Sequence, residues 1–339
     1  MRILIIRLSA IGDVVMASSL AGAIRARYPD AYIAWLTQPE AAGLLDANPA
    51  LNEVIVWPRD SWGRLWRAGQ GRRLAGEMTA FVRKLRARRF DLALDAQGLL
   101  KSGVWAWLSK APVRIGIGGR EGSGHLMTQV LSAPKNNPLI ASEYRLLAET
   151  VDAKTDDWSL RLSLSPQDRA SAEKVSAVAG TGGYIVLCPF TTRPQKHWIE
   201  DRWRAIAWRV AARWGLSTVI LGGPGDQQAG ANIAAAGGAE NLAGQTSLRQ
   251  AAAILESARA VIGVDTGLTH MATLLNRPTV ALFGSTQPYL DTGRPQSIVL
   301  YKGLPCSPCR RRPNCRGEFA CMAAILEDDV EEALASVMP

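Results

Sequence analysis

The 339-residue sequence has no apolar run that approaches the roughly 20 residues needed to span a bilayer. Its opening strand-like stretch is followed closely by Arg7 and Asp13. It therefore lacks the charged region, apolar core and small-residue cleavage site of a signal peptide. From these absences we expect a cytoplasmic protein.

The sequence also lacks the glycine fingerprint of dinucleotide-binding proteins. The first strand-to-helix turn, "RLSAIGDVV", carries one glycine, Gly12, where that fingerprint has three, and no matching acid follows about 20 residues later. "RIGIGGREGSG" (114–124) contains a Gly-x-Gly but is not the first turn of the fold. A NAD-dependent dehydrogenase is therefore disfavoured, and the carboxylate of Asp13 at this turn needs another explanation.

Recognisable RNP, KH and zinc-finger motifs are absent too, although the chain is basic with a net charge of +9. The basic residues concentrate in 59–73 and 83–89, near Trp57, Trp62 and Trp66. An acidic membrane surface or a phosphorylated acceptor on it fits this pattern, and a solvated helix face is the alternative. We expect no nucleic-acid partner.

Cysteine is scarce, and four of the five cysteines fall close together. Cys188 lies in a strand-like run, and we expect its thiol to pack in the hydrophobic core. The other four have the spacing C-x2-C-x5-C-x5-C, which in a cytoplasmic protein favours a structural metal site over disulfides. Reduced thiols that pack a loop, or disulfides formed after purification, are the alternatives. The candidate ligands are Cys306, Cys309, Cys315 and Cys321.

Strand-like runs alternate with amphipathic helical patterns along the whole chain, which is the βαβ order of parallel sheets covered on both faces. The alternation restarts near residues 150–170. We predict an α/β fold of two Rossmann-like domains that face each other across a cleft, with ligands at the carboxyl ends of the strands. The expected boundaries are 1–160, 161–325 and a C-terminal helix at 326–339.

The strongest ligand signals follow strands of the second half. "VDTGLTH" (264–270) places Asp265, Thr266 and Gly267 where a strand ends and a helix begins, with His270 one turn later. Free N–H groups at such a position favour a diphosphate, although a plain helix cap has the same sequence pattern.

Two further turns add to this signal. "TTRPQKHW" (191–198) supplies the hydroxyls of Thr191 and Thr192 and the positive charge of Lys196. "GGPGD" (222–226) supplies Asp226 as an acceptor for ribose hydroxyls. Taken together, the three turns predict a site for a nucleotide diphosphate.

The first half offers polar residues suited to a second substrate. "DAQGLLKS" (95–102) ends a strand with polar residues that include Lys101. Arg120 lies in the glycine-containing loop that follows and is suited to bind a carboxylate or phosphate.

With these motifs in this order, the chain resembles the bacterial ADP-heptose:lipopolysaccharide heptosyltransferases, which are inverting glycosyltransferases with the GT-B fold. The resemblance covers nearly the whole chain. It rests on "RLSAIGDV", "DAQGLLKS", "TTRPQKHW", "GGPGD" and "VDTGLTHMATLLNRPTVALFGSTQP". The sequence is most similar to the type that adds the first heptose to Kdo.

The resemblance implies a role for each candidate residue. Asp13 matches the general base that takes the proton of the acceptor hydroxyl, and Asp226 stands where the family has a glutamate for the ribose. The diphosphate would contact Thr191, Thr192 and Lys196. The heptose and phosphate end of the donor would contact Asp265, Thr266, Gly267 and His270. The phosphorylated acceptor would contact Arg59, Arg64, Lys101 and Arg120.

The resemblance also implies the reaction and its partners. The enzyme would move a heptose from ADP-L-glycero-D-manno-heptose to the Kdo-containing inner core of lipopolysaccharide, without a catalytic cofactor. It would act at the cytoplasmic face of the inner membrane of a Gram-negative bacterium. The four-cysteine segment would hold zinc or iron, as in a relative that modifies proteins. A second-heptose enzyme, a protein acceptor or another donor sugar are the alternatives.

Overall fold

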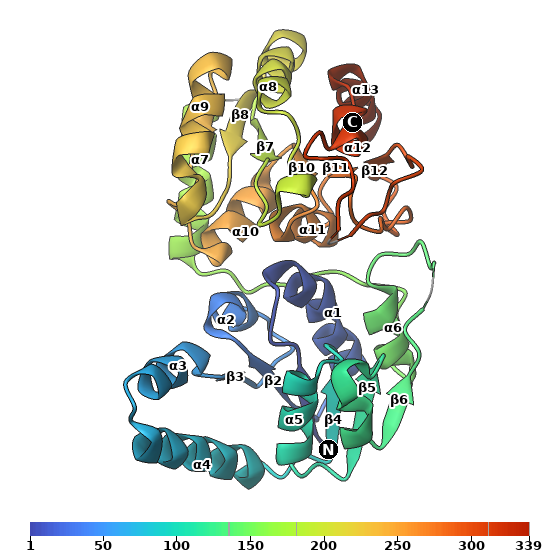
Figure 1. Cartoon of the computed structure of the whole chain (residues 1–339). Coiled ribbons are helices and arrows are strands. Elements are labelled where there is room, and N and C mark those ends of the chain that lie inside the picture. The colour runs from blue at the N-terminus through green and yellow to red at the C-terminus, as the bar shows by residue number, and fades with distance from the viewer. Residues whose placement is uncertain (135, 181, 311, 339) are drawn as a thin grey trace. The chain divides into compact units, whose positions relative to one another are not determined.

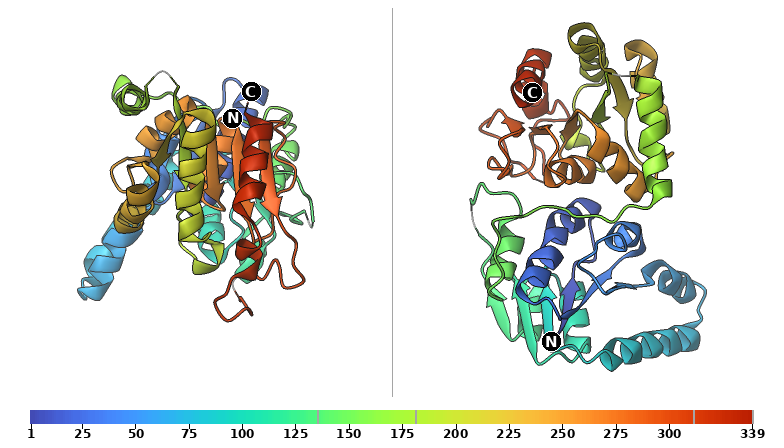
Figure 2. Two further views of the ribbon diagram at one scale, coloured as in Figure 1. Left: turned by 90° about the horizontal axis from the view of Figure 1, so that it is seen from above. Right: turned by 180° about the vertical axis from the view of Figure 1, so that it is seen from behind.

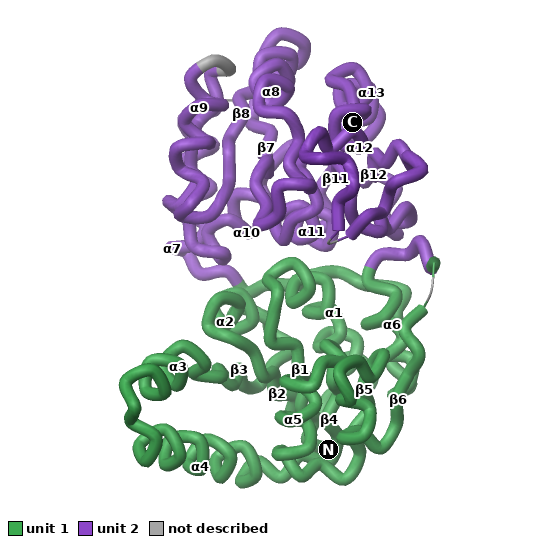
Figure 3. The backbone as a smooth tube through the Cα atoms, viewed as in Figure 1, with its two compact units in different colours: residues 1–136, 141–163 green, residues 137–140, 164–339 purple. Residues whose placement is uncertain are grey.

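The computed structural model describes residues 1–134, 136–180, 182–310 and 312–338. The chain divides into two compact units, shown in Figure 3. The first unit consists of residues 1–136 and 141–163, and the second of residues 137–140 and 164–339. The predicted assignment of acceptor binding to the first domain and donor binding to the second stays a prediction.

The first unit is built on a six-stranded parallel sheet with the strand order β3-β2-β1-β4-β5-β6. Its strands are β1 (Arg2–Ile6), β2 (Tyr32–Thr37), β3 (Glu53–Val56), β4 (Leu92–Asp95), β5 (Val113–Ile117) and β6 (Gln129–Leu131).

Helices cover both faces of this sheet (Figures 1 and 2). α1 packs against α2 and α6, whereas α4 packs against α3 and α5. The helices are α1 (Ile11–Arg27), α2 (Pro39–Leu45), α3 (Arg59–Arg67), α4 (Gly71–Ala87), α5 (Leu100–Leu108) and α6 (Ser142–Glu149), with a 3-10 segment η1 (Arg120–Leu126).

The second unit is also built on a six-stranded parallel sheet, with the strand order β12-β11-β10-β7-β8-β9. Its strands are β7 (Tyr184–Cys188), β8 (Ser217–Ile220), β9 (Glu240–Asn241), β10 (Ala260–Val264), β11 (Thr279–Phe283) and β12 (Ser297–Tyr301).

Here α10 packs against α7 and α11, and α8 packs against α9 and α13. The helices are α7 (Pro166–Ala179), α8 (Glu200–Trp214), α9 (Gln227–Gly237), α10 (Leu248–Ser257), α11 (Gly267–Leu274), α12 (Ala320–Ala323) and α13 (Glu327–Val337), with 3-10 segments η2 (Pro194–Lys196) and η3 (Pro224–Asp226).

The central strands are apolar throughout because both of their faces are covered. Ile3, Leu4, Ile5 and Ile6 of β1 are fully buried, as are the residues of β7 and β10. Strands buried on both faces read as continuous rather than alternating apolar runs, which is why these strands stand out in the sequence. The predicted α/β class of two parallel-sheet domains is confirmed.

Some elements differ from the expectation. "DAQGLLKS" is more than a polar turn, because α5 starts within it at Leu100. Gly98 adopts a positive φ of 64°, and its missing Cβ would lie 1.8 Å from the carbonyl oxygen of Ile117, so this turn requires glycine. The glycine-containing loop after β5 contains η1, which starts at Arg120.

Within the described ranges, no helix combines the length and apolar character needed to span a membrane.

Candidate functional site

Asp265 is the centre of a polar network in the second unit. It follows β10 directly, and Thr266 then caps α11 with extended backbone. One carboxylate oxygen, Oδ1, lies 3.1 Å from His270 Nε2. The other, Oδ2, lies 2.6 Å from Lys196 Nζ and accepts a hydrogen bond from the Thr286 hydroxyl. Both oxygens are therefore occupied by partners.

This environment fixes the charge of Asp265. Burial by itself disfavours the ionised carboxylate, but the hydrogen bond and charge of His270 and the charge of Lys196 outweigh it and hold the pKa of Asp265 well below its ordinary value. The side chain is 11% exposed. Asp265 is thus a permanent anion that orients Lys196 and His270 beside the start of α11.

The second ring nitrogen of His270, Nδ1, also has a polar partner. Nδ1 lies 2.8 Å from the hydroxyl of Tyr289, and Phe283 packs against the Tyr289 ring with centroids 5.1 Å apart. The Asp265 carboxylate can only accept a hydrogen bond, so Nε2–H donates to it, while Nδ1 pairs with the Tyr289 hydroxyl. The tyrosine therefore fixes the orientation of the histidine ring.

The loop after β7 lies against the same aspartate. The Thr191 hydroxyl is 3.5 Å from the carbonyl oxygen of Asp265, and Lys196 Nζ is 3.4 Å from it. His197 Nε2 is 2.8 Å from the carbonyl oxygen of Thr191, while Thr192 is exposed. The Thr191 hydroxyl, the Lys196 ammonium group and the N-terminus of α11 therefore gather at one sheet edge, a combination that favours a bound anion.

Asp226 lies at the end of the neighbouring strand, because β8 is next to β7 in the sheet. Its Oδ2 accepts a hydrogen bond of 2.7 Å from the backbone N–H of Gly223. At Gly222, a Cβ would lie 2.6 Å from the Phe190 ring and 3.1 Å from Asp226, so the close turn needs glycine here. The three predicted donor turns thus follow three adjacent strands, β10, β7 and β8.

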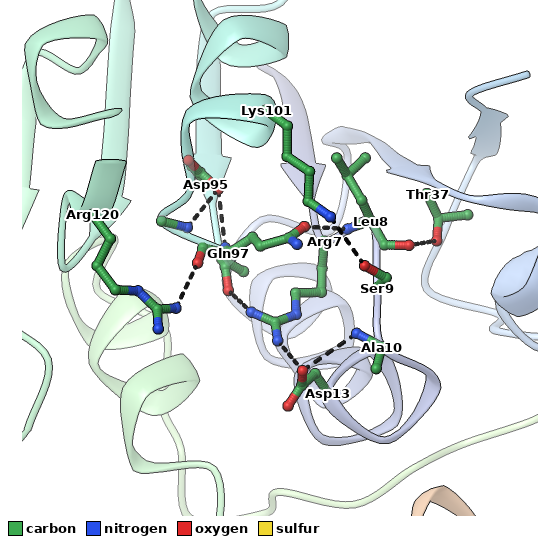
Figure 4. A network of polar contacts seen from close by, with 12 residues as sticks. Arg7, Leu8, Ser9, Ala10, Asp13, Thr37, Asp95, Gln97, Lys101 and Arg120 are labelled. Atoms are coloured by element: carbon green, nitrogen blue, oxygen red, sulfur yellow. Dashed lines mark hydrogen bonds and ion pairs between the residues drawn. The ribbon is translucent and has the colours of Figure 1, made fainter. Parts of the chain in front are cut away.

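In the first unit, Asp13 lies in the first turn of α1 (Figure 4). Its carboxylate forms an ion pair with Arg7 and accepts a 3.3 Å hydrogen bond from the backbone N–H of Ala10. The Arg7 side chain is 8% exposed and that of Asp13 is 40% exposed. A buried cation therefore fixes a carboxylate that stays open to solvent.

The loops after β1 and β4 are tied together around Arg7 (Figure 4). Arg7 donates to the carbonyl of Ala96 at 2.8 Å, and Gln97 accepts from the N–H of Leu8 at 2.9 Å. Asp95 is fully buried, which raises its pKa, and it accepts hydrogen bonds from the Gln97 backbone N–H at 2.9 Å and the Ser102 hydroxyl at 3.0 Å. Asp95 thus organises the turn that precedes α5, the helix that carries Lys101.

The structure brings several predicted acceptor residues together beside this loop. Lys101 Nζ lies 3.5 Å from the Ser9 hydroxyl; burial and then the charges of Arg59 and Arg7 lower its pKa. Arg120 donates to the carbonyl of Gln97 at 3.3 Å. The fourth candidate, Arg64, is exposed on α3, the helix that begins at Arg59. The cluster of cations favours an anionic ligand.

The four-cysteine segment does not present a metal centre. Among the residues that the structure describes, no three His, Cys, Asp or Glu side chains are placed to hold a metal ion. Burial raises the pKa of the Cys321 thiol, and nearby Cys309, Cys306 and Cys315 raise it further. The thiols are therefore close enough to interact electrostatically without converging as ligands. Burial also raises the pKa of Cys188 in β7.

Three residues of these networks are absent from the sequence-based site, namely Arg7, Thr286 and Tyr289. Thr286 lies within "TVALFGSTQP", so its position after a strand was a usable signal. Arg7 opens the motif "RLSAIGDV" and Tyr289 directly follows "TVALFGSTQP", but neither motif assigns these side chains a partner. Their contacts depend on tertiary packing.

Comparison with known proteins agrees with this architecture. The model of glycosyltransferase family 9 (heptosyltransferase) matches residues 78–319. Lipopolysaccharide heptosyltransferase 1 of Pseudomonas aeruginosa is 29% identical over 92% of this chain and 87% of its own. Lipopolysaccharide heptosyltransferase 2 of Salmonella typhimurium is 30% identical over 85% of this chain and 84% of its own.

Among solved structures, ADP-heptose lps heptosyltransferase II of E. coli superposes with a TM-score of 0.77 at 26% identity, covering 99% of this chain and 98% of its own. The predicted GT-B glycosyltransferase fold class and the family resemblance are both confirmed. The chain therefore belongs to glycosyltransferase family 9, the heptosyltransferase family.

Proposed function

We propose that this glycosyltransferase moves a heptose from ADP-L-glycero-D-manno-heptose to the Kdo-containing inner core of lipopolysaccharide. The observation that supports binding of the donor is the polar network at the start of α11, which consists of Asp265, Lys196, His270 and Thr191. The likeness to the E. coli ADP-heptose enzyme supports the donor's identity.

In this proposal the donor lies along the three turns of the second unit. Lys196 and the N-terminus of α11, with Thr266 and Gly267, stabilise the negative charge of the leaving diphosphate. Thr191 and Thr192 donate to phosphate oxygens, and Asp226 accepts from the ribose. His270 contacts the heptose end of the donor.

The reaction is a single displacement with inversion. The acceptor hydroxyl oxygen bonds to the anomeric carbon, the bond from that carbon to the diphosphate oxygen breaks, and ADP leaves with the electron pair. Asp13 takes the hydroxyl proton, for which its open carboxylate suits it. Cationic groups of the chain carry the leaving-group charge, so the proposed mechanism uses no catalytic cofactor.

The acceptor would bind through the cations of the first unit. Kdo carries a carboxylate and lipid A carries phosphates, and both match positively charged side chains. The residues assigned to this contact are Arg59, Arg64, Lys101 and Arg120. An acceptor of this kind is a membrane lipid, so we also propose that the protein works peripherally at the cytoplasmic face of the inner membrane.

We further propose that Cys306, Cys309, Cys315 and Cys321 hold a structural zinc or iron ion. The spacing of the four cysteines supports this assignment, and binding would require their thiols to converge beyond their present arrangement. Elemental analysis of purified protein should find one metal ion per chain, lost in Cys306→Ala/Cys309→Ala. A metal-free wild type would refute it.

The acceptor has a second candidate. The relatives include both lipopolysaccharide heptosyltransferase 1 and lipopolysaccharide heptosyltransferase 2, so a core that already bears one heptose is the alternative to bare Kdo-lipid A. A protein acceptor or another donor sugar would be the next alternatives.

One experiment separates these acceptors. Purified protein and ADP-heptose are incubated either with de-heptosylated Kdo2-lipid A or with a core that bears one heptose, and the acceptor mass is followed. A gain of one heptose on the first acceptor alone supports the proposal. A gain of heptose only on the core that already bears one heptose assigns the second-heptose reaction. If neither acceptor gains a heptose, the proposal of a lipopolysaccharide acceptor is wrong.

A further inference from the structure

Residues 59–89, which form α3, α4 and the turn between them, carry almost all of the excess charge of the chain. We name this segment the basic limb. Ten of its side chains are Lys or Arg and two are Asp or Glu, so it holds +8 of the net charge of +9. The remaining 308 residues are nearly neutral in sum.

The limb presents this charge to solvent. Nine of the ten basic side chains belong to exposed residues, and the tenth, Arg88, pairs with Glu53. Figure 1 shows α3 and α4 beside each other beyond β3, the edge strand of the sheet of the first unit. An ordinary solvated face mixes both signs of charge, whereas here basic residues outnumber acidic ones ten to two, and one of the two, Glu77, pairs with Arg73.

An aromatic cluster fixes the limb to its sheet. Trp62 of α3 and Phe81 of α4 have ring centroids 5.6 Å apart, and Phe81 lies 5.1 Å from Trp105 of α5. Leu85 is fully buried in the same core. The limb is therefore an anchored pair of helices with a defined outer surface.

Apolar side chains stand among the exposed charges. Trp66 is 73% exposed and Met78 is 43% exposed. The groove between the helices forms a cavity of about 250 Å³ lined by Pro58, Trp62, Ala80 and Phe81, with Lys84 and Glu77. In the described part of the chain, the buried Trp62 Nε1 has no hydrogen-bond partner.

We propose that the basic limb is the surface by which the protein docks on an anionic lipid bilayer. The inference rests on the proposed function, because a lipid acceptor has to be reached at a membrane. Arginines would contact lipid phosphates while Trp66 and Met78 enter the interface, the arrangement typical of interfacial basic helices. A nucleic acid would use the charge but leave Met78 without a role.

The test is co-sedimentation of the full chain with vesicles that contain no acceptor. Vesicles of phosphatidylglycerol and phosphatidylethanolamine are compared with uncharged phosphatidylcholine vesicles. Arg72→Gln/Arg83→Gln should lower the partition coefficient about 25-fold, roughly fivefold per charge, and added salt should weaken wild-type binding. The matched control is Lys154→Gln/Lys174→Gln, two exposed charges outside the limb.

Trp66→Ala should weaken vesicle binding as well, whereas Trp208→Ala, which removes a 65% exposed tryptophan of α8, should not. Circular dichroism confirms that each variant is folded. Equal losses in the limb and control variants, or a wild type that ignores anionic vesicles, would overturn the inference. So would binding to single-stranded DNA in place of vesicles.

Transfer to a detergent-solubilised acceptor, measured in parallel, separates this inference from the proposed function. The limb variants should keep the wild-type rate there, since neither Arg72 nor Arg83 belongs to the site. If wild type transfers heptose but does not bind vesicles, the docking role of the basic limb is wrong and the proposed function stands. If wild type binds vesicles but transfers no heptose, the proposed function is wrong and the docking role stands.

Discussion

At the scale of single residues, two aspartates at the ends of central strands have opposite environments. Asp265 is buried and both of its oxygens have partners, whereas Asp13 is 40% exposed and has one cationic partner, Arg7. An anion that is fully partnered orients its neighbours, and an open carboxylate can accept a proton. The environments therefore separate the two proposed roles.

Both aspartates were predictable because each lies where an apolar strand gives way to a helix, Asp265 directly after β10 and Asp13 in the first turn of α1. Their partners were not equally visible. Arg7 opens the motif "RLSAIGDV" and Tyr289 directly follows "TVALFGSTQP", but their roles come from burial and from contacts with residues that these motifs do not identify. Sequence spacing locates the end of a strand, but only packing decides which side chains meet there.

Asp265→Asn should lower the stability of the fold in a pH-dependent way. In the folded state the pKa of Asp265 is lowered. The ionised carboxylate therefore stabilises the fold at pH values above its pKa in the unfolded chain, which is about 3.9. This stabilisation is lost as the pH falls toward the pKa of Asp265 in the folded state. We expect a loss of about 3 kcal/mol in urea unfolding at pH 7, because Lys196 is left without its partner. The difference should shrink below about pH 4.

Asp226→Asn is the matched control, since Asp226 lies at a partly exposed turn and its exchange should cost about 1 kcal/mol or less. A loss for Asp265→Asn that is the same at pH 7 and at about pH 3.5 would contradict the assigned charge state.

At the scale of elements, the cysteine-bearing segment after β12 connects the end of β11 to the loop after β7 by hydrogen bonds. The Ser307 hydroxyl donates to the carbonyl of Gly284, and the Arg310 N–H donates to that of Ser285 at 2.6 Å. Gln195 Nε2 in the loop after β7 donates to the carbonyl of Arg310 at 3.1 Å. The segment thus joins the end of β11 to the loop that carries Lys196.

The central strands were predictable because they are short apolar runs bounded by turn residues. The segment at 302–319 has no apolar period, so its path and its contacts could not be derived. The start of α5 is hidden in the sequence, because it directly follows Gly98 and polar residues that are typical of a turn.

Gln195→Ala should loosen the donor loop without touching the reacting groups. We expect KM for ADP-heptose to rise about fivefold, the equivalent of one hydrogen bond, with kcat changed less than twofold. Steady-state kinetics measures both values. Gln228→Ala, at an exposed position on α9, should leave both unchanged; a fall in kcat alone for Gln195→Ala would show that the contact does not act through donor binding.

At the scale of the whole molecule, the two parallel-sheet units contain different clusters of polar residues. The first unit holds the basic limb and the cations near Asp13, and the second holds the Asp265 network. The uneven charge was visible in the sequence. That eight of the ten basic residues of the limb share two neighbouring helices depends on how the chain folds.

ADP should stabilise the chain through the second unit. A ligand at 100 times its Kd raises the unfolding free energy by about 2.7 kcal/mol when it binds only the folded state. Thermal unfolding with and without ADP measures this shift. We expect Lys196→Ala to lose most of it and Asp13→Asn to keep it; a shift that survives in Lys196→Ala would contradict the assigned diphosphate contact.

The most direct test of the account compares wild type with Asp13→Asn in transfer from ADP-heptose to Kdo2-lipid A, following ADP release and acceptor mass together. Wild type should release one ADP per heptose gained. Asp13→Asn should transfer about 100- to 10,000-fold more slowly, with ADP-heptose affinity by calorimetry unchanged. A variant that transfers at the wild-type rate, or a wild type that releases no ADP in the presence of acceptor, would contradict the account.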